Sequence, residues 1–91
     1  MEVLLQIVNL SPSDANVWVR LGVARFLAEQ RSAAVTALER AVEIDPKMAI
    51  AWQRLFLVYL MLERPGDAAK AFNMLSDLDP NLARDTLDQS G

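Results

Sequence analysis

The sequence predicts an all-α fold of stacked antiparallel helix hairpins, and three observations carry this prediction. The first is an internal repeat, because Trp18 recurs as Trp52 with a period of ~34 residues, which is typical of helical repeat arrays. Pro12, Pro46 and Pro80 recur at the same interval. The second is helical spacing of the apolar residues within each period. The third is the composition: 53% of the 91 residues are hydrophobic, and only three are Gly and four Pro, which excludes a disordered or fibrous chain.

Each period is predicted to contain a helix, a short turn and a second helix. In the first period we expect a helix over residues 15–29, a turn at residues 30–32 and a second helix that continues to residue 44. In the second period the sequence RPGD at residues 64–67 marks the turn. One such hairpin cannot bury its own apolar stripe, so neighbouring hairpins are expected to stack around a shared core.

Polar residues and prolines predict where these helices begin and where each unit ends. Ser13, Ser32 and Asp67 stand before helical runs, where a side-chain oxygen can accept hydrogen bonds from the first turn. A proline disfavours helical geometry in the residue before it. The unit boundaries are therefore expected at Ser11, Asp45 and Asp79.

Further residues follow a common pattern within the repeat period. In the first unit they are Trp18, Leu21, Gly22, Ala34, Leu38, Ala41 and Pro46. In the second unit they are Trp52, Leu55, Tyr59, Ala68, Phe72 and Pro80. This pattern resembles the tetratricopeptide repeat, whose signature has Trp, Leu-Gly, Ala, a large apolar residue, Ala and Pro in that order.

The resemblance implies a tetratricopeptide-type α-solenoid with two full repeats plus flanking helices in a single domain over residues 1–91. Repeat one is assigned to residues 15–48 and repeat two to residues 49–82. Residues 1–11 are similar to the second helix of a partial repeat, and residues 83–91 to a partial or capping helix.

The units depart from the family pattern at two positions. Gly22 of the first unit is replaced by Phe56 in the second, so the second hairpin is expected to open or repack in order to hold a ring. Arg25 stands in the first unit where the family usually has the tyrosine that the second unit keeps as Tyr59. Both differences affect local packing and leave the predicted fold unchanged.

The resemblance also implies that one face of each first helix lines a concave groove. On that face the first unit has Asn16, Val19, Arg20, Val23, Phe26 and Leu27, and the second has Ile50, Gln53, Arg54, Leu57, Leu60 and Met61. Val19, Val23 and Phe26 follow the i, i+4, i+7 spacing of a single helical face. The groove is predominantly apolar, which indicates a binding surface because soluble proteins rarely expose large apolar patches.

Two functions fit an apolar groove of this kind. One is a protein–protein interaction module or scaffold that binds a protein, a peptide or an amphipathic helix. The other is a self-associating structural segment of a larger tetratricopeptide assembly protein, with the groove buried in a homo-oligomer. A further alternative is that another part of the same protein, a curled terminus or additional repeats of a longer chain, covers the groove. The substitution Leu57→Asp is expected to abolish partner binding in the first case and to convert an oligomer to a monomer in the second.

One subset of the family binds carboxylate termini through Lys and Asn side chains in the groove. The corresponding positions here are Val19, Val23 and Arg54, so a clamp of that kind is not predicted. Arg20 and Arg54 occupy equivalent positions and either pair with an acidic residue of a ligand or extend into solvent.

The composition argues against most other functions. The chain has no Cys and no His, and no nucleophile, phosphate loop or ligand cluster is recognisable, so we predict no enzyme, no catalytic residue, no cofactor and no metal site. A net charge of −3 argues against nucleic acid as a partner. The apolar run at residues 55–62 is far shorter than the ~20 residues that span a bilayer, so membrane insertion is not predicted. The amino terminus lacks the basic start of a signal peptide, which leaves the cytoplasm as the default location.

Overall fold

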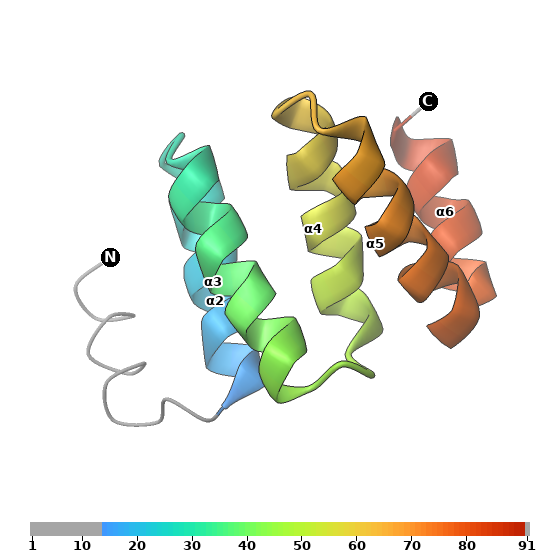
Figure 1. The fold of residues 1–91 in the computed structure, drawn as a ribbon, viewed down its shortest axis with the longest axis horizontal. Helices are drawn as coiled ribbons and strands as arrows, with labels where there is room; N and C mark the ends of the chain where they lie inside the picture. The colour runs from blue at the N-terminus through green and yellow to red at the C-terminus, as the bar shows by residue number, and fades with distance from the viewer. Residues whose placement is uncertain (1–13, 91) are drawn as a thin grey trace.

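The computed structural model describes residues 14–90, and in that range the chain folds into five α-helices without a strand (Figure 1). The helices are α2 (Ala15–Leu27), α3 (Arg31–Ile44), α4 (Ala49–Met61), α5 (Pro65–Leu78) and α6 (Pro80–Ser90). α2 packs against α3 and α4 packs against α5, and these two hairpins meet where α3 contacts α4. The predicted all-α fold of stacked hairpins is confirmed. The helix expected over residues 1–11 lies outside the described residues.

The first helix of each hairpin ends in the same left-handed turn. Glu29 has a φ of 63° and Glu63 a φ of 57°, although neither is glycine. After α2 the amide of Gln30 donates to the carbonyl of Arg25 at 2.8 Å, and the amide of Glu29 donates to Phe26 at 3.0 Å. These two bonds form a Schellman motif, which stops α2 at residue 27, before the predicted residue 29.

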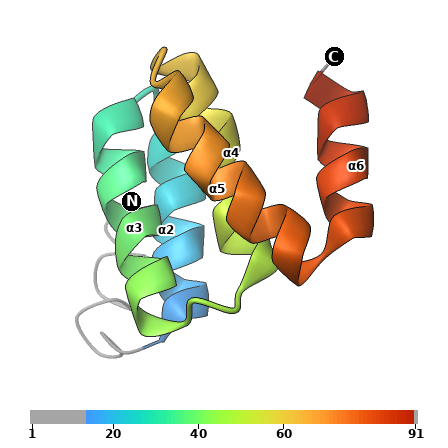
Figure 2. The ribbon, with the colours of Figure 1, turned by 45° about the vertical axis from the view of Figure 1, so that its right-hand side comes forward.

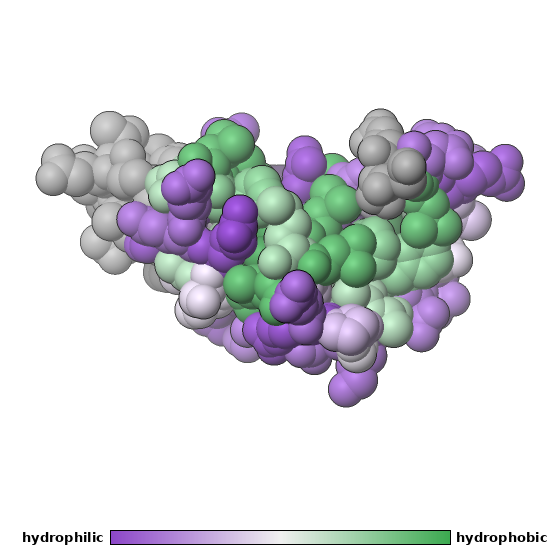
Figure 3. All heavy atoms as spheres, turned by 90° about the horizontal axis from the view of Figure 1, so that it is seen from above, coloured by the Kyte–Doolittle hydropathy of each residue, from purple (hydrophilic) through white to green (hydrophobic). Residues whose placement is uncertain are grey.

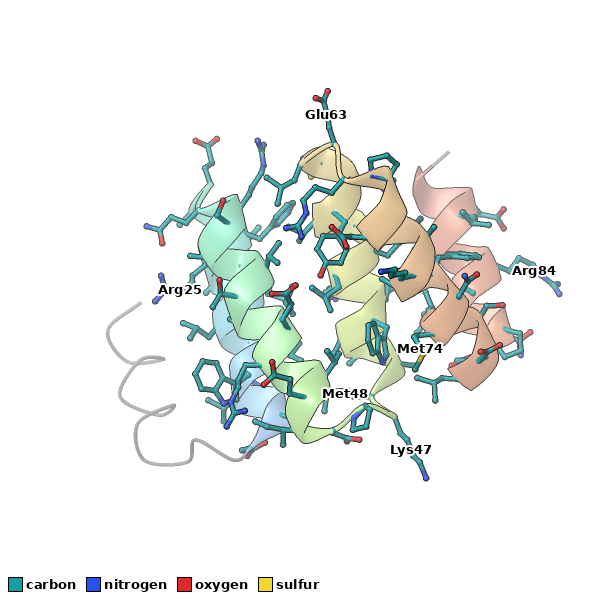
Figure 4. The ribbon with its side chains drawn as sticks, in the orientation of Figure 1. Arg25, Lys47, Met48, Glu63, Met74 and Arg84 are labelled. Atoms are coloured by element: carbon teal, nitrogen blue, oxygen red, sulfur yellow. The ribbon has the colours of Figure 1, made fainter. Side chains whose placement is uncertain are left out.

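The turn after α4 repeats this geometry with equivalent residues. The amide of Arg64 donates to the carbonyl of Tyr59 at 2.9 Å, and the amide of Glu63 donates to Leu60 at 3.1 Å. Figure 4 shows the Glu63 side chain at the tip of this turn, pointing away from the helices. The two turns are therefore short, and α3 and α5 begin almost at once after them.

Two of the predicted helix caps are wrong because α3 and α5 begin before the residues that were expected to cap them. Ser32 lies inside the first turn of α3, which begins at Arg31, and Asp67 lies inside the first turn of α5. Asp67 accepts from the Arg64 side chain at 2.8 Å instead of capping the helix. The cap of α2 is Asp14, whose carboxylate accepts from the amide of Asn16 at 3.0 Å. Ser13 lies outside the described residues.

The prolines end the second helices as predicted. Asp45 and Asp79, which precede them, have φ, ψ values of −135°, 88° and −152°, 86°, and both lie outside the helical region. The indole of Trp52 donates to the carbonyl of Pro46 at 2.8 Å and so fixes the start of α4 to this turn. Figure 2 shows α5 and α6 diverging from the second such turn.

The core combines small and large side chains from all the hairpin helices. Alanines allow the helix axes to approach, and leucines fill the space between them. The fully buried or nearly fully buried members are Leu21, Ala34, Ala37, Leu38, Ala41, Ala51, Leu55, Ala68, Ala71 and Leu75. Most of these positions belong to the repeat pattern, so the repeated residues mainly carry the packing.

A polar cluster joins the two hairpins. The hydroxyl of Tyr59 in α4 donates to a carboxylate oxygen of Glu39 in α3 at 2.7 Å, and the guanidinium of Arg64 lies 4.8 Å from the centre of the tyrosine ring. Burial, the hydrogen bond to Glu39 and the negative charge of Glu39 raise the pKa of Tyr59 well above its ordinary value of 10. The phenol therefore stays neutral and keeps its hydrogen bond at physiological pH.

The last helix is attached to α4 by a buried polar contact. The side-chain amide of Gln53 donates to the hydroxyl of Thr86 at 2.9 Å, and this hydroxyl donates to the carbonyl of Leu82 at 2.7 Å. Gln53 is 7% exposed and Thr86 is 1% exposed. The two side chains satisfy each other's hydrogen bonding within the protein, as buried polar groups require.

Candidate partner-binding groove

A cavity of about 460 Å³ lies between α2 and α4. Its lining residues are Gly22, Val23, Phe26 and Leu27 from α2, Leu38 from α3, and Arg54, Leu57, Val58, Leu60 and Met61 from α4. Apart from Arg54, none of them has a polar side chain. Because a cavity of ~150 Å³ holds one benzene ring, this one has room for about three side chains of that size.

The two walls of the cavity are built from equivalent residues of the two hairpins. Val23, Phe26 and Leu27 on α2 lie one repeat period before Leu57, Leu60 and Met61 on α4. The i, i+3, i+4 spacing places each set on one face of its helix. The cavity is therefore a direct result of the sequence repeat.

The floor of the cavity depends on the absence of a side chain at Gly22. A Cβ atom at this position would lie 2.6 Å from Cγ of Leu38 and 2.9 Å from its Cδ2, so no other residue fits without displacing Leu38. In the second hairpin the equivalent residues are Phe56 and Phe72, whose rings pack with centroids 5.2 Å apart at 53°. The expected repacking around Phe56 thus occurs by ring–ring contact, whereas Gly22 of the first hairpin is covered by Leu38.

The rim of the cavity is apolar and exposed to solvent. Leu27 is 75% exposed, Leu60 44% and Met61 49%. Figure 3 shows hydrophobic surface in the middle of the face seen from above, bordered by hydrophilic side chains. Clustered apolar exposure of this kind marks interaction sites more often than scattered single residues do.

Two arginines lie beside the apolar lining. Arg54 lines the cavity, and Arg20 is its equivalent on α2, three positions before Val23 and thus on the same helical face. Both side chains are exposed. Within residues 14–90 the ion pairs are Arg40–Glu43 and Arg64–Asp67, so neither groove arginine has a carboxylate partner there.

The structure brings part of the predicted groove together and places the rest elsewhere. The predicted residues that line the cavity are Val23, Phe26, Leu27, Arg54, Leu57, Leu60 and Met61. Asn16 is exposed, Val19 is buried in the core and Ile50 is partly buried, all toward the amino-terminal ends of their helices. Gln53 is buried against α6 by its bond to Thr86, so its side chain does not reach the cavity.

Three lining residues were not among those predicted, namely Gly22, Leu38 and Val58. Gly22 and Leu38 belong to the repeat pattern, and they pack closely against each other between α2 and α3. Both also line the cavity, although Leu38 is only 1% exposed. The substitution of Phe56 for this glycine in the next unit was the signal that could have identified the floor.

The described residues contain no grouping of acidic side chains that could hold a metal ion. No helix within residues 14–90 is long and apolar enough to cross a membrane. The chemistry that the cavity offers is thus apolar contact together with one guanidinium group.

Comparison with solved structures supports the described fold. The crystal structure of MamA superimposes with a TM-score of 0.84 and 30% sequence identity, over 87% of this chain and 46% of that protein. A second crystal structure of MamA protein gives a TM-score of 0.83 and 27% identity, over 96% of this chain and 52% of that one. The chain thus spans about half the length of the structures that it resembles. A comparison with curated proteins finds no match.

The sequence profile of the tetratricopeptide repeat matches residues 25–87, which is more than half of the chain. The match includes α3, α4 and α5 together with most of α6. The chain therefore belongs to the tetratricopeptide repeat family.

Proposed function

We propose that the chain is a protein–protein interaction module that binds a peptide or an amphipathic helix in the groove between α2 and α4. Members of its family are generally protein–protein interaction modules. The observation that carries the proposal is the apolar cavity of about 460 Å³ whose rim residues Leu27, Leu60 and Met61 are open to solvent. We assign the two hairpins to repeats over residues 15–48 and 49–82.

The size of the site is consistent with moderate affinity. Burial of the three exposed rim side chains contributes at most ~1.5–3 kcal/mol each, and the partly exposed Phe26 and Leu57 contribute less. Association and ordering cost ~4–15 kcal/mol. We therefore expect dissociation constants in the micromolar range or weaker for a short peptide, unless polar contacts add to the apolar ones.

The test is selection from a displayed library of random peptides of about 16 residues, which as helices span ~24 Å and exceed the length of α4. Binders selected on the wild-type chain are expected to be lost with Leu60→Asp. Leu87→Asp is the matched control, because Leu87 is 48% exposed, close to the 44% of Leu60, and does not line the cavity. Circular dichroism of both variants checks that the helices remain. Equal retention of binders by Leu60→Asp and wild type would contradict the assignment of the site.

A second candidate function is self-association through the same groove. It is favoured by the same exposed rim, because a second copy could cover it as well as a foreign partner could. Light scattering after size exclusion measures the solution mass of the wild type, Leu57→Asp and Leu60→Asp as the concentration is raised. A monomer in all three supports the binding module, and a wild-type dimer that both variants break supports self-association.

A further inference from the structure

We propose that the partner is an amphipathic helix with an acidic residue one helical turn from its apolar anchors, and that Arg54 binds this carboxylate. The inference rests on the proposed function, because it specifies the partner of the same groove. It is carried by charge complementarity at the edge of the cavity.

The position of Arg54 fixes where the partner's acidic residue must lie. Arg54, Leu57 and Met61 follow i, i+3, i+7 spacing and share one face of α4. With a rise of ~1.5 Å per residue, Arg54 is ~4.5 Å from Leu57 along the helix axis. A partner helix that places apolar side chains against Leu57 and Met61 therefore brings its preceding or following turn alongside Arg54.

The guanidinium of Arg54 is available for a carboxylate. It is exposed and forms no ion pair within the described part of the chain, where the carboxylates that pair with arginine are Glu43 and Asp67. A guanidinium offers several donors in a planar fork that matches a carboxylate, and bonds of this charge-assisted kind are stronger than neutral ones. Beside an apolar wall such a bond is also less screened by water than on an open surface.

The charges around the cavity also favour an acidic group at one end of the groove. Arg20 occupies the position equivalent to Arg54 on the neighbouring helix, so both walls carry a positive charge at the same level. None of the lining residues is acidic. One repeat period after Arg54, the equivalent position on α6 is Asp88, which is exposed. A partner's carboxylate is therefore attracted to the arginines of α2 and α4 and repelled by Asp88 of α6.

A helix fits this charge pattern better than an extended segment does. The groove has a basic end near Arg20 and Arg54 and an apolar end near Leu27 and Met61. Its walls are rows of side chains from α2 and α4, and a helix that lies between them can contact both rows. In a helix, residues three and four apart present the required apolar and acidic groups on one face.

The test repeats the peptide selection on the wild type and on Arg54→Glu. We expect wild-type binders to carry Asp or Glu three or four residues from an apolar cluster, and Arg54→Glu to select Lys or Arg at that place. The matched control is Lys70→Glu, which makes the same change of charge at an exposed residue of α5 away from the cavity. This control is expected to select the same acidic peptides as the wild type.

One selected peptide is then measured quantitatively by titration calorimetry. Replacing its acidic residue with Gln or Asn is expected to weaken binding to the wild type by about fivefold, as for an ion pair at a partly exposed rim. The acidic peptide and its Gln or Asn variant should bind Arg54→Gln with nearly the same affinity as each other, because the carboxylate has then lost its partner. A loss of affinity that persists in Arg54→Gln would overturn the role of Arg54.

The outcomes separate this inference from the proposed function. Selected peptides that need Leu60 but carry no acidic residue would overturn the inference and leave the binding module intact. If no selected peptide depends on Leu60, both the proposed function and the inference about Arg54 fail. A wild-type dimer that Leu60→Asp breaks and Arg54→Glu leaves unchanged would assign the groove to a second copy and also overturn the inference.

Discussion

Gly22 of α2 lies so close to Leu38 of α3 that a Cβ atom at position 22 would be 2.6 Å from the leucine Cγ. Leu38 is 1% exposed and cannot move aside without disturbing the core. The contact sets the distance between the two helices of the first hairpin, and it also forms the floor of the groove.

We expect Gly22→Ala to lower the free energy of unfolding by about 1–2 kcal/mol. Overpacking of a core costs ~1–3 kcal/mol, and the better helix propensity of Ala recovers up to ~1 kcal/mol. Urea unfolding followed by circular dichroism measures the difference. Gly66→Ala in α5 is the control, because no atom lies within 4 Å of its added Cβ, and there we expect a gain of up to ~1 kcal/mol. Equal effects at both sites would refute the role of the Leu38 contact.

Replacing Glu29 or Glu63 with Gly is expected to raise the free energy of unfolding by about 1 kcal/mol each. Both residues have positive φ, which costs a residue with a Cβ ~1–2 kcal/mol, and glycine offsets part of this gain through its unfolded-state entropy. The melting temperature of each variant reports the change. Glu29→Ala and Glu63→Ala keep the Cβ and serve as controls that should give no such gain. A similar increase in the alanine variants would attribute the effect to the lost charge.

The stability of the protein is expected to fall above pH 10 through Tyr59. The folded-state pKa of Tyr59 is raised, so its contribution is fully present below the unfolded value of 10 and is lost as the pH rises from there toward the folded pKa. Tyr59 is the one tyrosine of the chain, so tyrosinate absorbance follows it alone. We expect the native protein to titrate at a distinctly higher pH than the urea-unfolded protein. Coincident titration curves would refute the buried hydrogen bond to Glu39.

Thr86→Val is expected to lower the free energy of unfolding by about 1–3 kcal/mol, because it leaves the buried amide of Gln53 without an acceptor. Gln53→Leu should cost less, since the Thr86 hydroxyl keeps its bond to the carbonyl of Leu82. The double variant should be more stable than the sum of the two losses predicts. Urea unfolding of all four proteins gives the coupling energy. Additive losses would mean that the pair does not hold α6 against α4.

The sequence predicted the hairpins well because their determinants are local and repeated. Asp45 is non-helical before a proline, and the indole of Trp52 donates to the carbonyl of that proline, Pro46, both at positions that the repeat pattern singled out. The caps at Ser32 and Asp67 were wrong because the preceding turns use glutamate in a left-handed conformation, where the usual signal is glycine. Without that signal, the sequence does not reveal how early α3 begins, whereas Pro65 at the first position of α5 is typical of a helix start.

The groove was predictable only in part, because its limits depend on contacts between distant segments. Leu57 and Leu60 were assigned to the groove from the family resemblance, and both line the cavity. Gln53 has the same periodicity, yet its partner is Thr86, far along the chain, and only the packing of α6 removes it from the groove. The floor at Gly22 depends likewise on how closely Leu38 approaches from the neighbouring helix.

If the groove binds a helix as proposed, the difference between Gly22 and Phe56 restricts that helix to one alignment along the array. An array of identical repeats would offer equivalent binding sites one repeat period apart, so a bound helix could shift from one to the next. Here the positions equivalent to Gly22 and Leu38 hold the paired rings of Phe56 and Phe72, and the position equivalent to the two arginines holds Asp88. A partner displaced by one repeat would lose both its pocket and its charge partner, so a repetitive scaffold can hold a helix in a single register.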